Sequence, residues 1–163
     1  LTWDRFLGHR SSYDVTAAGF NYRIDDLRAA PLQVQLRSLD RLNRLRRERV
    51  EWYRECLGQD PHWMVPFEDC EGASSHHLFT IVLGERVPRD RVMTFMRARG
   101  IQTSVHYPPV HQFAFYRKLC PPLSDLNITE ALGRRLLTLP LFPDMRREQV
   151  DLVCDSLREA VAF

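Results

Sequence analysis

A helical pattern of apolar residues from residue 25 to residue 57 constrains the fold of this 163-residue chain more than any other feature. Apolar side chains recur there at the three- and four-residue intervals of one helix face. They are Leu32, Leu36, Leu39, Leu42, Leu45, Trp52 and Tyr53. A helix of this length spans at least about 45 Å, which predicts a helix that joins two bodies. An interior proline costs about 3 kcal/mol, so we expect a kink or a restart near Pro31.

After Gly58 the pattern changes to short elements of both kinds, which predicts a small α/β or α+β domain over residues 58–163. Three stretches have the apolar content of strands, namely residues 62–65, 77–83 and 101–107. Three others have helical periodicity, namely residues 89–99, 127–139 and 144–161. We expect Gly100 to end the first of these helices, Asn127 to cap the second and Asp144 to cap the third.

The segment before the long helix is polar and irregular over residues 1–18, as in a loop that leaves another body. The chain starts at Leu1 without an initiator methionine, so we expect it to belong to a longer protein. The next octet, Gly19-Phe20-Asn21-Tyr22-Arg23-Ile24-Asp25-Asp26, ends in two carboxylates suited to cap the helix. It also holds an amide, a phenol and a guanidinium within three residues. Two interpretations stay open for the octet alone: a ligand-binding loop, or a loop whose polar groups face water.

A second polar segment, His106-Tyr107-Pro108-Pro109-Val110-His111, follows the third predicted strand. Folds of the α/β kind place ligand-binding groups at such strand ends, and the two prolines make the segment rigid. A hydrogen-bonded structural turn is the alternative. The two histidines are a weak metal signal, because they flank a turn and no carboxylate or cysteine stands beside them. His77 begins the second predicted strand, and we expect it to be a buried core residue.

Composition argues against several classes of function. The formal net charge is +2, and acidic residues interrupt the arginine-rich stretch of the long helix, so no nucleic-acid-binding surface is expected. The sequence has no run of about 20 apolar residues and no basic-then-apolar N-terminus, so neither a membrane span nor a secretory signal is expected. Four widely spaced cysteines without a Cys-x-x-Cys pair argue against a zinc site and fit a reducing cytoplasm. They are Cys56, Cys70, Cys120 and Cys154.

Lys118 is the only lysine of the chain, and therefore its only candidate for a Schiff-base amine. The sequence contains neither a Gly-x-Ser-x-Gly nucleophile elbow nor a glycine-rich phosphate-binding fingerprint. No pair of carboxylates stands out as a general acid and base. The residues alone therefore predict an α/β body with two ligand-capable loops, and they assign no catalytic residue and no metal ligand.

Five motifs follow one another along the chain. The first is the segment from Gly19 to Ala30 followed by Gln35-Leu36, which is similar to the pattern G-x-N-Y-R-M-x-E-L-x-A-A … Q-L. The others are Ser75-His76-His77-Leu78-Phe79, Arg99-Gly100-Ile101, the segment from His106 to His111, and Leu139-Pro140-Leu141-Phe142-Pro143. Together, and in this order, they resemble the pyridoxal-phosphate-dependent nucleotide-sugar aminotransferases of the DegT/StrS type. Ile24 and Asp26 are conservative departures, whereas Pro31 replaces a helix-forming aliphatic residue.

The resemblance implies the C-terminal part of a fold-type-I pyridoxal-phosphate-dependent transferase. Residues 1–24 would be the tail of the large domain with a loop at the edge of the cofactor. Residues 25–57 would be the interdomain helix, and residues 58–163 the small C-terminal α/β domain. In the family, the large domain carries the Schiff-base lysine, and Lys118 does not occupy the position of that lysine.

The resemblance also implies roles for single residues. Asn21 matches the asparagine that reaches the phosphate of pyridoxal 5'-phosphate in the neighbouring subunit, and Arg23 is expected at the same cofactor. The other expected contacts are with the sugar-nucleotide substrate. The residues concerned are Tyr22, His106, Tyr107 and His111.

The activity that the resemblance implies is transfer of an amino group from an amino acid, glutamate, to a keto-sugar nucleotide. The enzyme would be a cytoplasmic homodimer with shared active sites. This chain alone is expected to be inactive, because it lacks the Schiff-base lysine. The alternative is a non-catalytic truncated or split paralogue that binds a sugar nucleotide or a subunit.

Overall fold

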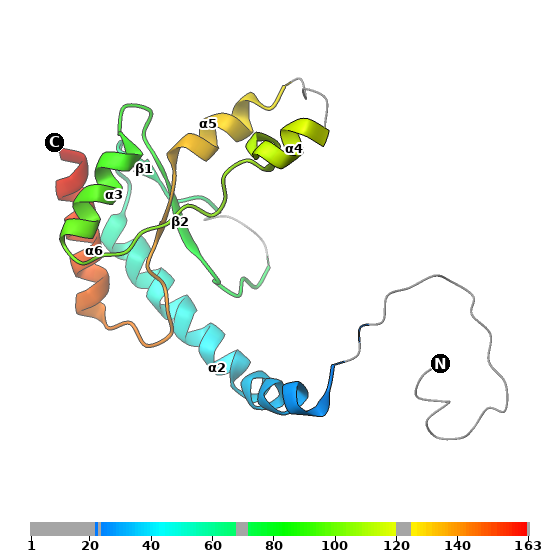
Figure 1. The fold of residues 1–163 in the computed structure, drawn as a ribbon. Helices are drawn as coiled ribbons and strands as arrows, with labels where there is room; N and C mark the ends of the chain where they lie inside the picture. Colours follow the sequence, from blue (N-terminus) through cyan, green and yellow to red (C-terminus); the bar gives the residue numbers. More distant parts are fainter. Residues whose placement is uncertain (1–21, 23, 68–71, 120–124, 163) are drawn as a thin grey trace, which may run out of the picture. The chain divides into compact units, whose positions relative to one another are not determined.

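The computed structural model describes residue 22 and residues 24–67, 72–119 and 125–162. Contacts group the chain into two units, Leu1–Arg37 and Ser38–Phe163, and each unit is described by itself. Both helices and strands occur along the described residues, which confirms the expected mixture of both (Figure 1). Their order is α2 (Asp26–Leu57), β1 (Trp63–Met64), β2 (Phe79–Leu83), α3 (Arg89–Ala98), the 3-10 helix η1 (Val110–Gln112), α4 (Ala114–Leu119), α5 (Asn127–Arg135), β3 (Leu136–Leu139) and α6 (Arg147–Ala162).

Helix α2 begins where the sequence predicts. The Asp25 Oδ1 atom accepts a hydrogen bond of 2.9 Å from the backbone N–H of Arg28, which is the contact of an N-terminal cap. The helix then continues through Pro31, so the restart considered there does not occur. Pro31 lies in the second turn, near a helix end, where the loss of one backbone donor is a local cost that the long remainder of the helix tolerates.

The sheet has three antiparallel strands in the order β1-β2-β3. Phe79 pairs with Leu139 and Ile81 with Leu137 across β2 and β3, and all four side chains are buried. Because successive side chains of a strand point to opposite faces, Thr138 points away from the face that Leu137 and Leu139 share. The second face of β3 therefore carries a hydroxyl.

The third strand is not the one that the sequence predicts. Residues 101–107 touch the sheet at a single bridge, where Ser104 pairs with Thr138 on the outer edge of β3. The third strand is instead Leu136–Leu139, the end of a stretch expected to be helical. Periodicity alone does not distinguish a short apolar run in a strand from one in a buried helix, and here pairing with β2 decides the outcome.

The helix ends agree with the sequence in part. Gly100 adopts a φ of +74° just after α3, as expected for a glycine that ends a helix. Asn127 is the first residue of α5. Leu126 occupies the N-cap position, so Asn127 is not the cap that the sequence predicts. Helix α6 begins at Arg147 rather than just after Asp144. At its start the backbone N–H of Arg146 donates a hydrogen bond of 2.9 Å to Gln149 Oε1, a side-chain contact typical of a helix N-terminus.

The core of the second unit lies where β2 and β3 meet helices α3 and α6 and the C-terminal part of α2. Helices α3 and α6 lie on one side of β2 in Figure 1, and α5 lies on the other. Tyr53 of α2 stacks on Phe79 at 4.5 Å between ring centroids and donates its hydroxyl to the Pro140 carbonyl at 2.8 Å. Burial raises the pKa of the Tyr53 phenol well above its usual range.

Candidate functional site

The His106 loop, defined as residues 104–112, leaves the sheet at the bridge between Ser104 and Thr138. The two residues exchange backbone hydrogen bonds of 2.8 and 3.1 Å, so the start of the loop is fixed to the edge of β3. Farther along, Pro109 packs on α5. A Cβ atom at Gly133 would lie 2.7 Å from the ring carbons of Pro109, so only glycine allows this close approach. The sheet and α5 thus hold the loop at two places.

Two hydroxyls hold the imidazole of His106. Its Nδ1 atom lies 3.0 Å from Thr138 Oγ1 and 3.2 Å from Ser104 Oγ. Thr138 is only 4% exposed, and a buried hydroxyl donor needs an acceptor. Among the described residues, Nδ1 of His106 is the recorded partner of this hydroxyl. We therefore infer that Nδ1 accepts, which places the proton of the neutral ring on Nε2.

This arrangement leaves the half-buried His106 with one donor atom for a ligand. With Nδ1 engaged by the protein, Nε2–H is the atom that remains to donate to an acceptor oxygen of a ligand, such as a phosphate, carboxylate or hydroxyl oxygen. Because one contact comes from the loop and the other from β3, the ring orientation depends on the packing of both segments.

His106, Ser104 and Thr138 line a cavity of about 490 Å³ that the sheet edge and α6 share. Its other walls are mostly aliphatic, and Gln102 and Gln149 supply two amides. Apart from His106, the described residues of the lining include no Asp, Glu, Lys or Arg. Such a cavity suits an uncharged ligand part with both apolar and hydroxyl groups.

Tyr107 and His111 lie in the same loop but have different surroundings. The Tyr107 ring meets that of His106 edge-on at 4.9 Å, and its side chain is 68% exposed. His111 turns toward α5, where its Nε2 atom lies 3.0 Å from Glu130 Oε1. The hydrogen bond with His111 is the main cause that lowers the pKa of the Glu130 carboxyl, and Gln112 contributes in the same direction. The loop therefore brings His106 and Tyr107 together, whereas His111 anchors it to α5.

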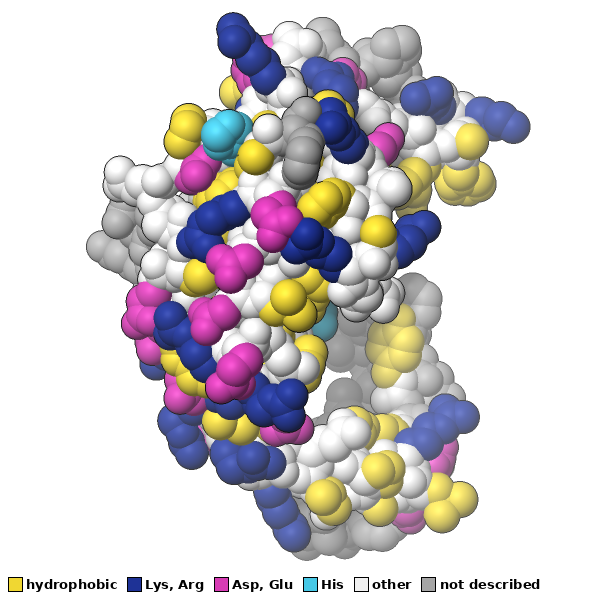
Figure 2. Space-filling view, turned by 90° about the vertical axis from the view of Figure 1, so that its left-hand side faces the viewer, with side chains coloured by type: hydrophobic (Ala, Val, Ile, Leu, Met, Phe, Trp, Pro, Cys, Tyr) yellow, Lys and Arg dark blue, Asp and Glu magenta, His cyan; other side chains and the backbone are white. Residues whose placement is uncertain are grey.

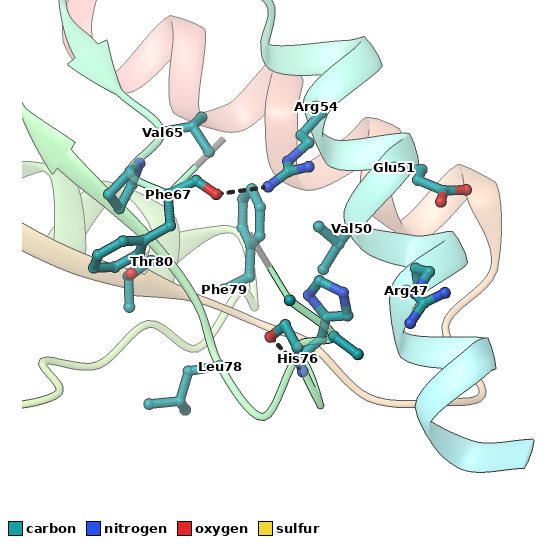
Figure 3. A pocket seen from close by; sticks show the side chains of 14 residues that line it. Arg47, Val50, Glu51, Arg54, Val65, Phe67, His76, Leu78, Phe79 and Thr80 are labelled. Carbon is teal, nitrogen blue, oxygen red and sulfur yellow. Dashed lines mark hydrogen bonds between the residues drawn. The ribbon is translucent and has the colours of Figure 1, made fainter. Parts of the chain in front are cut away.

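A second cavity, of about 710 Å³, lies between α2 and the segment before β2 (Figure 3). Arg47 and Arg54 lie two turns apart on α2, and the His76 ring points toward this helix. Burial lowers the pKa of His76, and the positive charges of Arg47 and Arg54 lower it further, whereas Glu51 opposes them. His76 is therefore neutral at pH 7. Its neighbour His77 is exposed and precedes β2, so the expectation that His77 is a core residue is wrong.

The remaining candidate residues belong to the first unit. Tyr22 is 89% exposed at the described start of the chain. Asn21 and Arg23 lie outside the described residues, so their expected contacts with a cofactor stay predictions.

Lys118 lies exposed in α4 and lines neither of these two cavities. Within the described ranges, no three His, Cys, Asp or Glu side chains converge to form a metal site. None of the described helices combines the length and the apolarity of a membrane span. On the face drawn in Figure 2, basic and acidic side chains are interspersed.

Sequence reasoning missed the partners of the histidines. Ser104 and His106 are two residues apart in an extended segment and so share one side of it, which is a signal that was present in the sequence. Thr138 had no such signal, because it lies 32 residues away from His106 and its stretch was expected to be helical. The contact between Glu130 and His111 had no such signal either, because the two residues lie 19 positions apart.

Comparison with solved structures finds similar folds. S. venezuelae DesV, in complex with a ketimine intermediate, is 33% identical with a TM-score of 0.80, and the match covers 98% of this chain and 42% of DesV. The aminotransferase TlmJ from Streptoalloteichus hindustanus is 27% identical with a TM-score of 0.77, over 93% of this chain and 40% of TlmJ. DesI, in the presence of its TDP-sugar product, is 28% identical with a TM-score of 0.70, over 77% of this chain and 33% of DesI.

The chain therefore spans less than half the length of these relatives, and its fold matches a part of each. This outcome confirms the expected fold class, the C-terminal part of a fold-type-I transferase, with a small antiparallel sheet. A family model also matches residues 3–158, nearly the whole sequence. The chain belongs to the DegT/DnrJ/EryC1/StrS aminotransferase family.

Proposed function

We propose that this chain is the C-terminal part of an aminotransferase that moves an amino group from an amino acid, glutamate, to a keto-sugar nucleotide. The observation that supports this proposal most is the family match over residues 3–158, together with the arrangement of His106. Two of the structural relatives were solved with such molecules, DesV with a ketimine intermediate and DesI with its TDP-sugar product.

The surroundings of His106 support a role for this residue in substrate binding. Its Nε2–H is free to donate to an oxygen of the sugar nucleotide, while Ser104 and Thr138 orient the ring from the other side. Tyr107 lies beside His106 and exposes most of its ring, so it can stack on a sugar or a base. His111 anchors the loop to α5 through Glu130. Its expected contact with the substrate stays a prediction.

Helix α2 supports the division into two domains. Several apolar side chains in its first turns are exposed, including Leu27 at 89% and Leu36 at 70%. An exposed apolar face of this kind needs a covering surface. In the proposed enzyme, the large domain covers it, and residues 25–57 are the interdomain helix.

The cofactor of the proposed enzyme is pyridoxal 5'-phosphate, which supplies the electron sink for amino transfer. This chain does not offer its covalent attachment, because Lys118 is exposed on α4. The chain instead contributes Asn21 and Arg23 to the cofactor phosphate of a neighbouring subunit in a homodimer. An amide and a guanidinium both donate to phosphate oxygens.

The experiment uses the longest open reading frame that contains this sequence. The purified protein is incubated with pyridoxal phosphate, ¹⁵N-glutamate and a panel of keto-sugar nucleotides, and the products are analysed by mass spectrometry. We expect transfer of ¹⁵N to one keto sugar. The 163-residue chain alone, assayed in parallel, is expected to give no product and no borohydride-trappable cofactor adduct. Lys118→Arg is the matched control for adventitious labelling of the exposed amine.

The competing proposal is a non-catalytic module that binds a sugar nucleotide or a subunit. It predicts binding of the nucleotide sugar by calorimetry without any ¹⁵N transfer, even in the longest reading frame. A specific adduct on Lys118 with turnover by the short chain would contradict both proposals, because it would place the catalytic amine within this sequence.

A further inference from the structure

Two cysteines that are far apart in the sequence meet in the second unit. Cys154 of α6 is fully buried in the core, and Cys56 in the last turns of α2 is half-buried against the same core. Arg158, one turn after Cys154 on α6, contacts the backbone and the sulfur of Cys56, so α6 brings Cys154 to the side of α2 that carries Cys56. Neither residue lines the cavities described above, so this pair is separate from the candidate site.

A guanidinium lies next to this pair. Arg158 is one turn after Cys154 on α6, and its Nη2 atom donates to the Cys56 carbonyl oxygen and lies 3.7 Å from Cys56 Sγ. Its Nη1 atom bonds to Asp155 Oδ1 at 2.7 Å, which holds the side chain over Cys56. A positive group at this distance stabilises the negative charge that develops on sulfur during oxidation.

The surroundings assign different roles to the two thiols. Burial raises the pKa of Cys154, and the neighbouring Cys56 raises it further, so Cys154 stays a thiol at neutral pH. Cys56 is the less buried of the two residues, and its sulfur is the one beside Arg158. An oxidant from solution therefore reaches Cys56 first, and Cys154 is in position to react second.

We propose that a peroxide oxidises the thiols of Cys56 and Cys154 to a disulfide. In the first step, the Cys56 thiolate attacks one peroxide oxygen and the O–O bond breaks, which gives a sulfenic acid and, after proton transfer, water. In the second step, the Cys154 sulfur attacks the Cys56 sulfur, and the S–O bond breaks. The leaving hydroxide takes the proton of the Cys154 thiol. Two thiols lose two electrons in total, and hydrogen peroxide is reduced to two waters.

The disulfide joins the C-terminal end of α2 to α6 and closes a long loop of the chain. A cross-link of this kind restricts the unfolded chain, so the oxidised protein has the higher melting temperature. Reduction by a dithiol restores the two thiols and the lower melting temperature.

The test uses the full chain in the Cys70→Ser/Cys120→Ser background, in which only the pair can react. The protein is treated with one equivalent of hydrogen peroxide, blocked with an alkylating agent, digested and analysed by mass spectrometry without reductant. We expect a linked peptide pair containing Cys56 and Cys154, lost on treatment with dithiothreitol. Oxidation of Cys56 to sulfinic acid without any linked peptide would overturn the proposal.

Three variants resolve the order of events. Cys154→Ser should accumulate a dimedone-reactive sulfenic acid on Cys56, whereas Cys56→Ser should leave Cys154 unmodified. Arg158→Gln should slow the first step by about fivefold, the factor that corresponds to two unit charges about 4 Å apart in bulk water. Equal reactivity of Cys154 in the Cys56→Ser protein would contradict the assigned order. The wild-type sequence is digested in parallel, and a preference for linkage to Cys70 or Cys120 there would also overturn the proposal.

Discussion

The Nδ1 atom of His106 lies 3.0 Å from the Oγ1 atom of Thr138, 32 residues farther along the chain. Strand β3 thereby orients an imidazole that belongs to a loop. Thr138 is placed for this contact because its neighbours Leu137 and Leu139 are buried in the core on the opposite face. Packing of the core thus determines which way a candidate binding group points.

Thr138→Val should release the His106 ring while preserving side-chain shape. In the wild-type chain we expect the Nε2–H tautomer in long-range ¹H–¹⁵N NMR spectra at pH 8, and in the variant a mixture of tautomers. Loss of one buried hydrogen bond should also lower the free energy of unfolding by about 1 kcal/mol in urea titrations. Thr94→Val removes a hydroxyl that bonds to the Asp90 carbonyl on the exposed side of α3, and should leave the His106 signals unchanged. Dominance of Nδ1–H in the wild type would contradict the inference.

Tyr53→Phe should weaken the fold at neutral pH and change its response to alkali. The variant loses the hydrogen bond to the Pro140 carbonyl, which should lower the free energy of unfolding by about 1–2 kcal/mol. The pKa of Tyr53 is raised in the folded state, so the neutral phenol stabilises the fold below the unfolded-state pKa of about 10 and this contribution is lost as pH rises further.

The free energy of unfolding of the wild type should therefore fall more steeply above pH 10 than that of Tyr53→Phe. Denaturation in guanidinium chloride between pH 8 and pH 11 measures both slopes. Tyr116→Phe, which alters a phenol outside the core, is the control and should follow the wild type. Parallel curves for wild type and Tyr53→Phe would show that burial of the phenol has no effect on the pH dependence.

His111→Ala should raise the pKa of the Glu130 carboxyl toward its ordinary value, because the hydrogen bond with His111 is the largest cause that lowers it. A carboxyl with a lowered pKa stabilises the fold above its unfolded-state pKa of about 4.3, and this contribution is lost as pH falls through the folded-state value. Titration of the Glu130 carboxyl by ¹³C NMR measures the shift. Arg134→Gln, which removes a more distant charge at 3.9 Å, should have the smaller effect. The reverse ranking would count against the role of His111.

Pro31→Ala should strengthen the first turns of α2. Alanine restores a backbone donor and relieves the clash with the preceding turn. Together these changes should raise the free energy of local opening of the helix by about 1–3 kcal/mol. Hydrogen exchange of the amides from residue 26 to residue 34 should slow accordingly, as read by mass spectrometry. Gln33→Ala, in the same turn, is the control for a simple gain in helix propensity. Identical exchange in Pro31→Ala and wild type would mean that Pro31 imposes no local cost.

Asn21→Ala should weaken retention of pyridoxal phosphate in the longest reading frame. Loss of one hydrogen bond to a charged phosphate corresponds to about tenfold in affinity. Fluorescence titration of the apoenzyme measures this affinity. Asn43→Ala is the matched control, since the Asn43 amide bonds to Arg46 within α2. Unchanged affinity in Asn21→Ala would remove Asn21 from the cofactor site.

Local signals in the sequence predicted local structure well. The Asp25 cap, the length of α2 and the positive φ of Gly100 depend on neighbours within a few residues, and each was predicted. At Pro31 the sequence predicted a kink or a restart. The helix continues through Pro31 without a restart, because the cost of one lost donor is small beside the cooperativity of a 32-residue helix, and the kink stays a prediction.

Features that depend on distant partners were predicted less well. Residues 136–139 and 101–107 are both short and apolar, and only pairing with β2 decides that the first forms a strand. The same limit applies to the candidate site. His106 was identified from its loop, but its partner Thr138 follows from the register of β3, which no local pattern encodes.

The bridge between Ser104 and Thr138 has a consequence for how this fold can diversify. It closes the base of an excursion that contains η1, α4 and α5, and Arg89 holds the C-terminal part of α5 by donating to the Gly133 carbonyl at 2.6 Å. Because the base is held independently, a change in length within the excursion adds only a slowly growing closure cost, about 0.6 kcal/mol for each doubling. Insertions and deletions there leave the register of β2 and β3 intact. Evolution can therefore remodel the surroundings of His106 by changing the length of one segment, without redesigning the sheet.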